Sequence, residues 1–167
     1  FGREFNAVIP VLSPETARRL EIRDARHPLL EDILRKQRKP IQPISMALDE
    51  QQRTLLISGP NTGGKTVALK TAGMLCLMAQ AGMPGPCTSA EFPVVEQVLA
   101  DIGDHQSLAE SLSSFSSHVV EVRAMLENAH RDSLLLLDEL GRATDPDEGG
   151  ALGVAILDRL RKTGAFV

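Results

Sequence analysis

The chain has 167 residues, of which 43% are hydrophobic and 24% charged, and its formal net charge at pH 7 is −4. These values fit one globular domain with an apolar core and exclude an intrinsically disordered chain. The negative charge excludes a surface that grips nucleic acid over its whole extent, and the absence of Trp and Tyr disfavours a platform for stacking bases.

Two cysteines fit neither a disulfide framework nor metal-ligand spacing, so we expect a reducing, cytoplasmic setting. No apolar run is long enough to predict a membrane span, and we expect no membrane partner. The sequence begins without Met and stops inside an apolar stretch, so we expect a piece of a longer protein.

Residues 1–50 are punctuated by five prolines, a pattern that favours short strands and turns over long helices. We therefore expect a β-rich lead-in subdomain here. The basic cluster 35–39 predicts an exposed loop; a nucleic-acid patch is the alternative interpretation.

Strands and helices are predicted to alternate from residue 54 onward. Apolar runs predict buried strands at 54–58, 94–102 and 134–137. Helical spacing predicts helices at 65–81, 117–129 and 146–162, and the second of these should turn Val119, Val122, Met125, Leu126 and Ala129 inward. Asp145 as N-cap followed by Pro146 marks the start of the last helix. This alternation predicts an α/β domain with a largely parallel sheet flanked by helices.

The run from residue 59 to 66 satisfies the phosphate-binding loop pattern, with a predicted strand before it and a helix after it. It reads Gly59, Pro60, Asn61, Thr62, Gly63, Gly64, Lys65 and Thr66. Glycines let backbone N–H groups face a phosphate, Lys65 should reach the β- and γ-phosphates, and the Thr66 hydroxyl should ligate Mg²⁺. The alternative interpretation is a glycine-rich turn that only starts a helix.

A second candidate site follows the apolar run 134–137, where the next two residues are Asp138 and Glu139. Asp138, at the carboxyl end of a buried strand, would belong to the Mg²⁺ shell, and Glu139 would polarise the attacking water. Such a pair alone often marks only the end of a strand. The phosphate loop upstream makes a nucleotide-hydrolysing site the preferred interpretation.

Four strings together resemble the ATPase domain of MutS-type proteins: residues 57–66, Asp101-Ile102-Gly103-Asp104, residues 111–118 and Asp138-Glu139-Leu140-Gly141. The string 114–118 and Thr144-Asp145-Pro146 are most similar to the second bacterial MutS subfamily, although His105 and Arg142 differ from its usual residues. The resemblance implies a P-loop NTPase fold of the ABC type. Residues 51–167 would form the ATPase core, truncated before the end of the strand that begins near Ala165 and precedes the family's switch histidine.

The resemblance also implies where further site residues lie. ATP would bind at a homodimer interface, and Ser113 of one subunit would complete the γ-phosphate site of the other. Read alone, the serine-rich run 111–117 would be a helix cap. Gln106 would lie in the loop that senses Mg²⁺ and water, or be an ordinary loop glutamine. His27 and Ile41 would lie beside the base, with a turn or core histidine as the alternative for His27.

The function implied is Mg²⁺-dependent hydrolysis of ATP to ADP and phosphate in a MutS-like DNA repair or recombination-control protein. DNA would be bound by parts outside these residues, and the isolated chain should be weakly active or inactive. A nucleotide-gated module acting on structured RNA or ribosomes is the alternative from another class. An ABC-type transporter or chromosome-clamp ATPase is a third, but its Leu-Ser-Gly-Gly signature is absent from the sequence.

Overall fold

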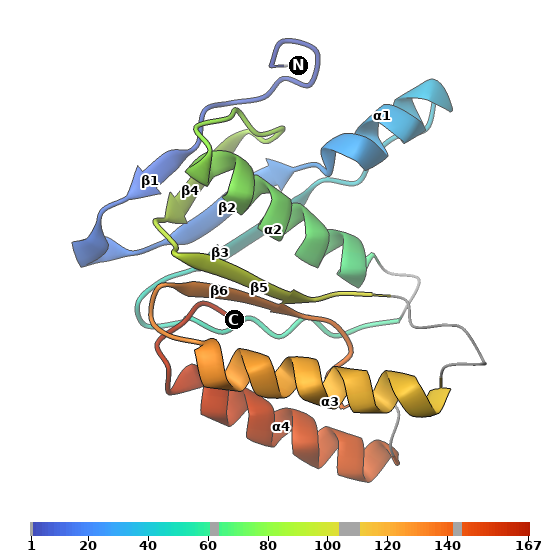
Figure 1. The fold of residues 1–167 in the computed structure, drawn as a ribbon. Coiled ribbons are helices and arrows are strands. Elements are labelled where there is room, and N and C mark those ends of the chain that lie inside the picture. Colours follow the sequence, from blue (N-terminus) through green and yellow to red (C-terminus); the bar gives the residue numbers. More distant parts are fainter. Residues whose placement is uncertain (1, 61–63, 104–110, 142–144) are drawn as a thin grey trace. The chain divides into compact units, whose positions relative to one another are not determined.

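The computed structural model describes residues 2–60, 64–103, 111–141 and 145–167, with the backbone alone for 111–117 and 146. The chain divides into two compact units, Phe1–Val95 and Glu96–Val167, and each is described by itself. Both units contain helices and strands (Figure 1). The α/β class predicted from the sequence is therefore confirmed.

The first unit is built on a four-stranded sheet with the strand order β1-β4-β2-β3. In chain order its elements are β1 (Val11–Ser13), the short 3-10 helix η1 (Glu15–Ala17), β2 (Leu20–Ala25), α1 (Pro28–Lys36), β3 (Ile44–Leu48), α2 (Lys65–Gln80) and β4 (Ser89–Pro93). Strand β1 runs parallel to β4, whereas β2 is antiparallel to both β3 and β4. This sheet is mixed, whereas the sequence pattern predicts a largely parallel one.

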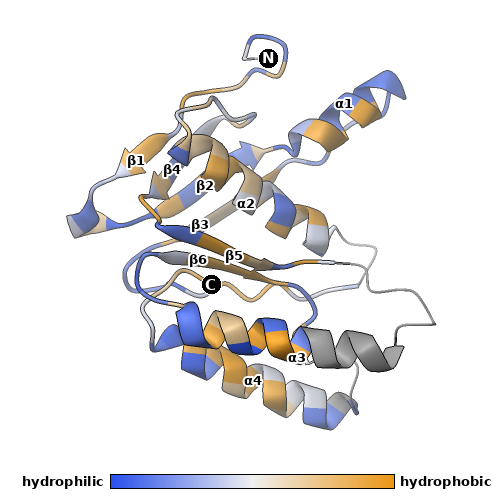
Figure 2. Ribbon diagram, viewed as in Figure 1, coloured by the Kyte–Doolittle hydropathy of each residue, from blue (hydrophilic) through white to orange (hydrophobic). Residues whose placement is uncertain are grey.

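Helix α1 departs from the expectation of strands and turns in residues 1–50. Pro28 occupies its first turn, where a proline has no N–H to lose and its fixed φ suits the helix. Hydrophobic and hydrophilic residues alternate along α1 (Figure 2). Arg35 and Lys36 form its last turn, so the basic cluster is partly helical, and the Arg35 guanidinium lies 4.7 Å from the Phe5 ring centroid.

Helix α2 confirms the helix predicted at 65–81. Its buried face consists mostly of small residues at helical spacing: Ala68, Thr71, Ala72, Gly73, Leu75, Cys76 and Ala79. Gly82, with φ of +69°, follows the helix and allows the chain to turn. The Gln80 side chain donates to the carbonyl of Pro93 at 3.0 Å, which ties the end of α2 to the end of β4.

The strand predicted at 54–58 is absent from the structure, and this prediction is wrong. The segment is irregular, and Leu55 and Leu56 are 40% and 74% exposed. An apolar run becomes a strand only when neighbouring strands take its backbone hydrogen bonds. No strand of the described residues pairs with this segment, and the parallel pair β5–β6 belongs to the other unit.

The second unit contains β5 (Gln97–Asp101), α3 (Ser111–Asn128), β6 (Ser133–Leu137) and α4 (Pro146–Arg161). Strands β5 and β6 pair in parallel, in register from Gln97 opposite Ser133 to Asp101 opposite Leu137. On the other side of β6, the Leu135 N–H donates to the Phe166 carbonyl at 2.8 Å. The predicted strands 94–102 and 134–137 are confirmed here, the first in a shorter form.

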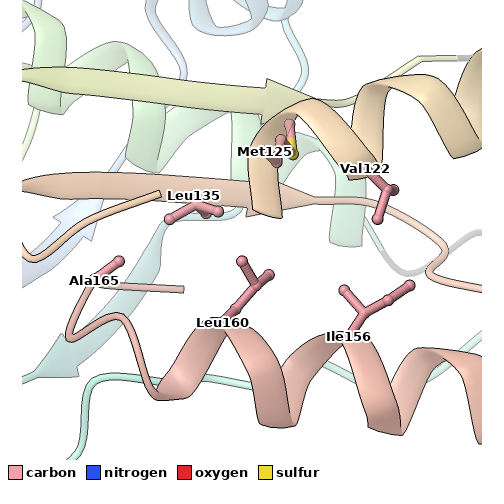
Figure 3. Packing of buried hydrophobic residues seen from close by; sticks show 6 residues of the cluster. All are labelled: Val122, Met125, Leu135, Ile156, Leu160 and Ala165. Atoms are coloured by element: carbon pink, nitrogen blue, oxygen red, sulfur yellow. The ribbon is translucent and has the colours of Figure 1, made fainter. Parts of the chain in front are cut away.

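Helices α3 and α4 pack on one face of β5 and β6 (Figure 1). Figure 3 shows the core that they form, with Ile156 and Leu160 of α4 pointing towards Leu135 of β6. Val122 and Met125 of α3 complete it and are at most 7% exposed. Val119 was expected to face inward but is 42% exposed, so this part of the prediction is wrong.

Helix α4 confirms the last predicted helix, including its N-cap. The Asp145 side chain accepts the N–H of Asp147 at 3.0 Å, and Gly164, with φ of +80°, follows the helix. Across the described residues, no helix combines the length and the apolar composition that crossing a membrane requires.

Candidate functional site: a glycine-rich helix start and a carboxylate-bearing strand end

The predicted phosphate loop leads directly into α2. Asn61, Thr62 and Gly63 lie outside the described residues, whereas Gly59, Pro60 and Gly64 to Thr66 lie within them. Gly59 and Gly64 have φ of +145° and +78°, a region that residues with a Cβ rarely adopt. An added Cβ would meet nothing within 4 Å at either position. The backbone conformation, rather than a lack of space, therefore favours glycine at both.

The N-terminus of α2 differs from those of α1 and α4 because its N-cap residue, Gly64, has no side chain that could cap it. His27 and Asp145 each accept an N–H from the first turn of α1 and α4, and both of those helices have acidic residues in that turn. Gly64 offers α2 no side-chain cap, and the first turn of α2 has no acidic residue. An uncapped helix start of this kind presents N–H donors and partial positive charge to an anion such as phosphate.

Lys65 is folded back over the loop, and its Nζ donates to the Gly59 carbonyl oxygen. The two ends of the loop are thereby joined by the one side chain that the motif assigns to the phosphates. A phosphate oxygen would replace a neutral carbonyl with an anionic acceptor, which makes a stronger hydrogen bond with an ammonium. Thr66, the next residue of the helix, is half-buried.

His27 and Ile41 lie in the same unit as the loop. The His27 Nδ1 accepts the Leu30 N–H at 3.4 Å as the N-cap of α1. Burial, and after it the positive charge of Lys70 on α2, lower the pKa of His27 below its ordinary value of 6.5. Ile41 is half-buried in the irregular segment between α1 and β3. The turn role considered for His27 is thus present, and a role of either residue beside the base stays a prediction.

We expect an NMR titration to give His27 a pKa below 6.5, the direction set by burial and Lys70. Because folding lowers this pKa, neutral His27 contributes to the stability of the folded chain above pH 6.5. This contribution is lost as the pH falls through the pKa of His27 in the folded state. The free energy of unfolding should therefore decrease below pH 6.5. His27→Asn, which keeps an N-cap acceptor but does not titrate, should flatten this decrease. A His27 pKa at or above 6.5 would contradict the prediction.

Asp138 and Glu139 directly follow β6, as predicted. The Asp138 N–H donates to the Asp101 carbonyl at 2.9 Å, which extends the β5–β6 ladder by one step. Asp138 is half-buried and Glu139 exposed. Glu139 has φ of +52°, in the left-handed region, where a residue with a Cβ is strained by about 1–3 kcal/mol. Such strain is frequent at functional sites and is consistent with a chemical role for this carboxylate.

Two residues after Glu139, the chain passes very close to α4. Gly141 has φ of +80°, and a Cβ added to it would lie 2.0 Å from the carbonyl oxygen of Gly149. Leu140, which lies between Glu139 and Gly141, packs against the core of the second unit. The turn that presents Glu139 is therefore fixed by backbone contact with the first turns of α4.

Gly141→Ala should destabilise the chain by about 2–4 kcal/mol, because it adds both backbone strain and a clash with backbone atoms. The matched control is Gly150→Ala on α4, where an added Cβ would meet nothing within 4 Å. Because alanine is the better helix former, this control should be neutral or up to about 1 kcal/mol more stable. Urea unfolding followed by far-ultraviolet circular dichroism measures both, since the chain has no Trp or Tyr for fluorescence. Equal stabilities of the two variants would contradict this account of the turn.

Asp101 and His118 lie within the strings that resemble the MutS family, but the sequence predicts no role for either residue. The structure brings them together: His118 Nδ1 of α3 lies 2.7 Å from Asp101 Oδ2, and their side chains are 15% and 6% exposed. Neither residue carries a signal by itself. The one sequence signal that could have pointed to them is that both lie in strings that resemble the MutS ATPase domain.

The remaining predicted site residues lie wholly or partly outside the part of the chain that the structure describes. Gln106 lies outside the described residues, as do Asp104, His105 and Arg142, and Ser113 is described only as part of the α3 backbone. The phosphate loop belongs to the first unit, and Asp138, Glu139 and Ser113 to the second. Within each unit the structure brings together Gly59 with Lys65, Asp138 with Asp101, and Asp101 with His118.

Comparison with known proteins identifies the family. Residues 55–167 match the family MutS domain V, a range that includes both the phosphate loop and Asp138. The chain belongs to the MutS family. It is 46% identical over 167 residues to the Endonuclease MutS2 of Shouchella clausii, and 48% identical over 162 residues to that of Alkaliphilus oremlandii. These alignments cover 99% and 96% of this chain and place it in the MutS2 subfamily.

The chain spans about a fifth of the length of these MutS2 relatives, since each alignment covers 20% of the relative. The domain V match begins at residue 55 and continues to the last residue, while the predicted boundary at residue 51 stays a prediction. The similarity to the MutS2 proteins also includes the first 54 residues, because it covers nearly the whole chain.

Proposed function

We propose that this chain binds ATP and hydrolyses it with Mg²⁺, as the P-loop, ABC-type ATPase domain of a MutS2-like protein. The observation that carries the proposal is the start of α2, where a glycine-rich loop, an uncapped helix N-terminus and Lys65 meet. The match to MutS domain V supports it, because that match includes both this loop and the carboxylates after β6. Residues 1–50 would be the lead-in subdomain, and residues 51–167 the ATPase core.

The residues have separate roles in this proposal. Lys65 and the N–H groups of the loop bind the phosphates, and Glu139 accepts a proton from the attacking water. Thr66 and Asp138 offer a hydroxyl and a carboxylate oxygen, the donor types that Mg²⁺ prefers, and the ion would neutralise phosphate charge. Ser113 acts on the ATP of a second subunit. Gln106 would orient water near the ion.

We place the base of the nucleotide beside Ile41, in the same unit as the phosphate loop. Ile41 is half-buried and offers an aliphatic surface without hydrogen-bonding groups, so selectivity for adenine over guanine should be modest. His27 would border this place, although its Nδ1 already caps α1. Competition by GTP for bound ATP tests this part of the proposal, and strict exclusion of GTP would contradict it.

The complete protein is proposed to be a cytoplasmic homodimer that acts in DNA repair or recombination control. The name Endonuclease MutS2 of the relatives supports a DNA substrate. The net charge of −4 supports contact with DNA through parts of the protein other than these residues. Light scattering with and without ATP tests the dimer, and ATP turnover with and without DNA tests the coupling.

Removal of Mg²⁺ gives the direct test of the chemistry. We expect the complete protein to release phosphate from ATP, to stop when EDTA exceeds Mg²⁺, and to recover when Mg²⁺ is restored. The isolated chain should be much slower, because loss of one transition-state donor such as Ser113 costs about 10²–10³ in rate. Turnover that continues in excess EDTA, or the absence of any ATP binding, would contradict the proposal.

A further inference from the structure

Asp101, which is buried, and His118, which is half-buried, are two polar side chains in contact that the proposed reaction does not use directly. Asp101 is the last residue of β5, and His118 lies in α3. Their nearest side-chain atoms are 2.7 Å apart, and the Asp101 carboxylate is almost entirely buried. No aligned hydrogen bond from the described residues reaches Asp101 Oδ2, and the His118 imidazole is the charged or polar side chain recorded beside this buried oxygen.

The backbone of the same residue contacts the candidate Mg²⁺ ligand. The Asp101 carbonyl accepts the Asp138 N–H at 2.9 Å, and Asp101 pairs with Leu137 in the ladder. Asp101 therefore binds α3 through its side chain and the end of β6 through its backbone. All these groups belong to the second unit.

Helix α3 also carries Ser113, five residues before His118 and therefore about 7.5 Å away along the helix axis. Further along the helix, Val122 and Met125 pack in the apolar core, which is a non-directional contact. A buried imidazole–carboxylate contact depends much more strongly on distance and orientation. Where His118 is held, the first turns of α3 are held as well.

We propose that Asp101 and His118 form a positioning pair that fixes the N-terminal turns of α3, and with them Ser113, relative to Asp138. The inference rests on the proposed function, because Ser113 acts on ATP only in that reaction. His118 touches neither substrate nor metal; it keeps the serine-bearing helix and the carboxylate-bearing strand in one rigid arrangement.

Steady-state kinetics of the complete protein test the pair. His118→Leu should lower kcat for ATP about 10- to 100-fold, the effect of misplacing a reacting group by about 1 Å. KM should change less than about threefold, because the phosphate loop keeps its contacts. His118→Asn should restore kcat to within about threefold of the wild type, since its amide N–H can occupy the place of Nδ1–H. In the His118→Leu background, Asp101→Asn should cause no further loss.

Hydrogen–deuterium exchange without nucleotide gives a readout that does not depend on activity. Amides 111–118 should exchange faster in His118→Leu than in the wild type, and at the wild-type rate in His118→Asn. The matched control is His130→Leu, which removes an exposed imidazole 3.6 Å from Glu96 in the same unit. This control should change neither exchange nor kcat.

Each outcome decides the inference. The inference is overturned if His118→Leu has the kcat and the exchange rates of the wild type. It is also overturned if His118→Leu and His118→Asn lose kcat equally while their exchange rates are unchanged. If His118→Leu does not fold, two other variants decide: His118→Asn should keep the wild-type kcat and exchange rates, and Asp101→Leu should slow turnover. A slow His118→Asn together with a normally active Asp101→Leu overturns the pair. If the wild type hydrolyses no ATP, the proposed function fails, while the exchange experiment still decides whether the pair holds α3.

Discussion

The Lys65→Ala variant should bind ATP about 10- to 150-fold more weakly than the wild type, because a charge-assisted contact of about 1.5–3 kcal/mol is lost. The fold should remain. Lys65 stands at the first position of α2, where a positive charge opposes the helix dipole and alanine is a good helix former. Loss of the hydrogen bond to the Gly59 carbonyl acts in the opposite direction, because it destabilises the fold. Since these effects partly cancel, the free energy of unfolding should change by no more than about 1 kcal/mol.

Isothermal titration calorimetry of the complete protein with ATP measures this effect, and urea unfolding measures stability. Lys70→Ala is the matched control: it removes an exposed lysine from the same helix, outside the predicted loop. It should leave ATP affinity within about twofold of the wild type. Equal affinities of the Lys65→Ala variant and the wild type would contradict a phosphate-binding role for this loop.

Short-range signals predicted the elements that proved correct. Helices α2 and α4 have helical spacing along their whole length and glycine after their ends, and Asp145 is a recognisable N-cap. Strand β6 contains a run of four leucines, a strong local signal for a buried strand, and it pairs in parallel with β5. In each case the residues that decide the structure lie within the element or next to it.

Elements that depend on distant partners were predicted poorly. The run 54–58 has a suitable composition but finds no partner strand among the residues that the structure describes. Helix α1 begins at Pro28, whose ring disfavours a helix everywhere except in the first turn. The antiparallel pairing of β2 with β3 and β4 joins segments that no motif connects. The composition of a segment limits which secondary structures it can form, whereas tertiary contacts determine which of these it adopts.

The candidate site shows the same division. Motifs predicted Lys65 and Asp138 as site residues, because phosphate and Mg²⁺ binding require particular residue types at fixed spacing. The left-handed backbone of Glu139 and the contact between Gly141 and Gly149 have no sequence signal, since both arise from how the turn packs on α4. The Asp101–His118 pair joins residues 17 positions apart and becomes visible only when β5 and α3 are placed together.

Glu139→Gln should retain ATP binding but lower the turnover of the complete protein by about 10²–10⁴-fold, because an amide cannot accept a proton from water as a carboxylate does. The two side chains have nearly the same shape, and Glu139 is exposed, so the fold should be unchanged. Glu127→Gln, an exposed substitution in the same unit, is the matched control and should turn over normally. Turnover of Glu139→Gln within about tenfold of the wild type would mean that Glu139 is not the main base.

Glu139→Gly separates this chemical role from the strain of the backbone. Glycine adopts a φ of +52° without a steric penalty, so the variant should be as stable as the wild type or up to about 1 kcal/mol more stable. It should nevertheless be as inactive as Glu139→Gln, because the carboxylate is gone. Urea unfolding and phosphate release, measured on the same preparations, test both parts. A destabilised Glu139→Gly would show that the left-handed turn carries no strain, whereas an active one would remove Glu139 from the mechanism.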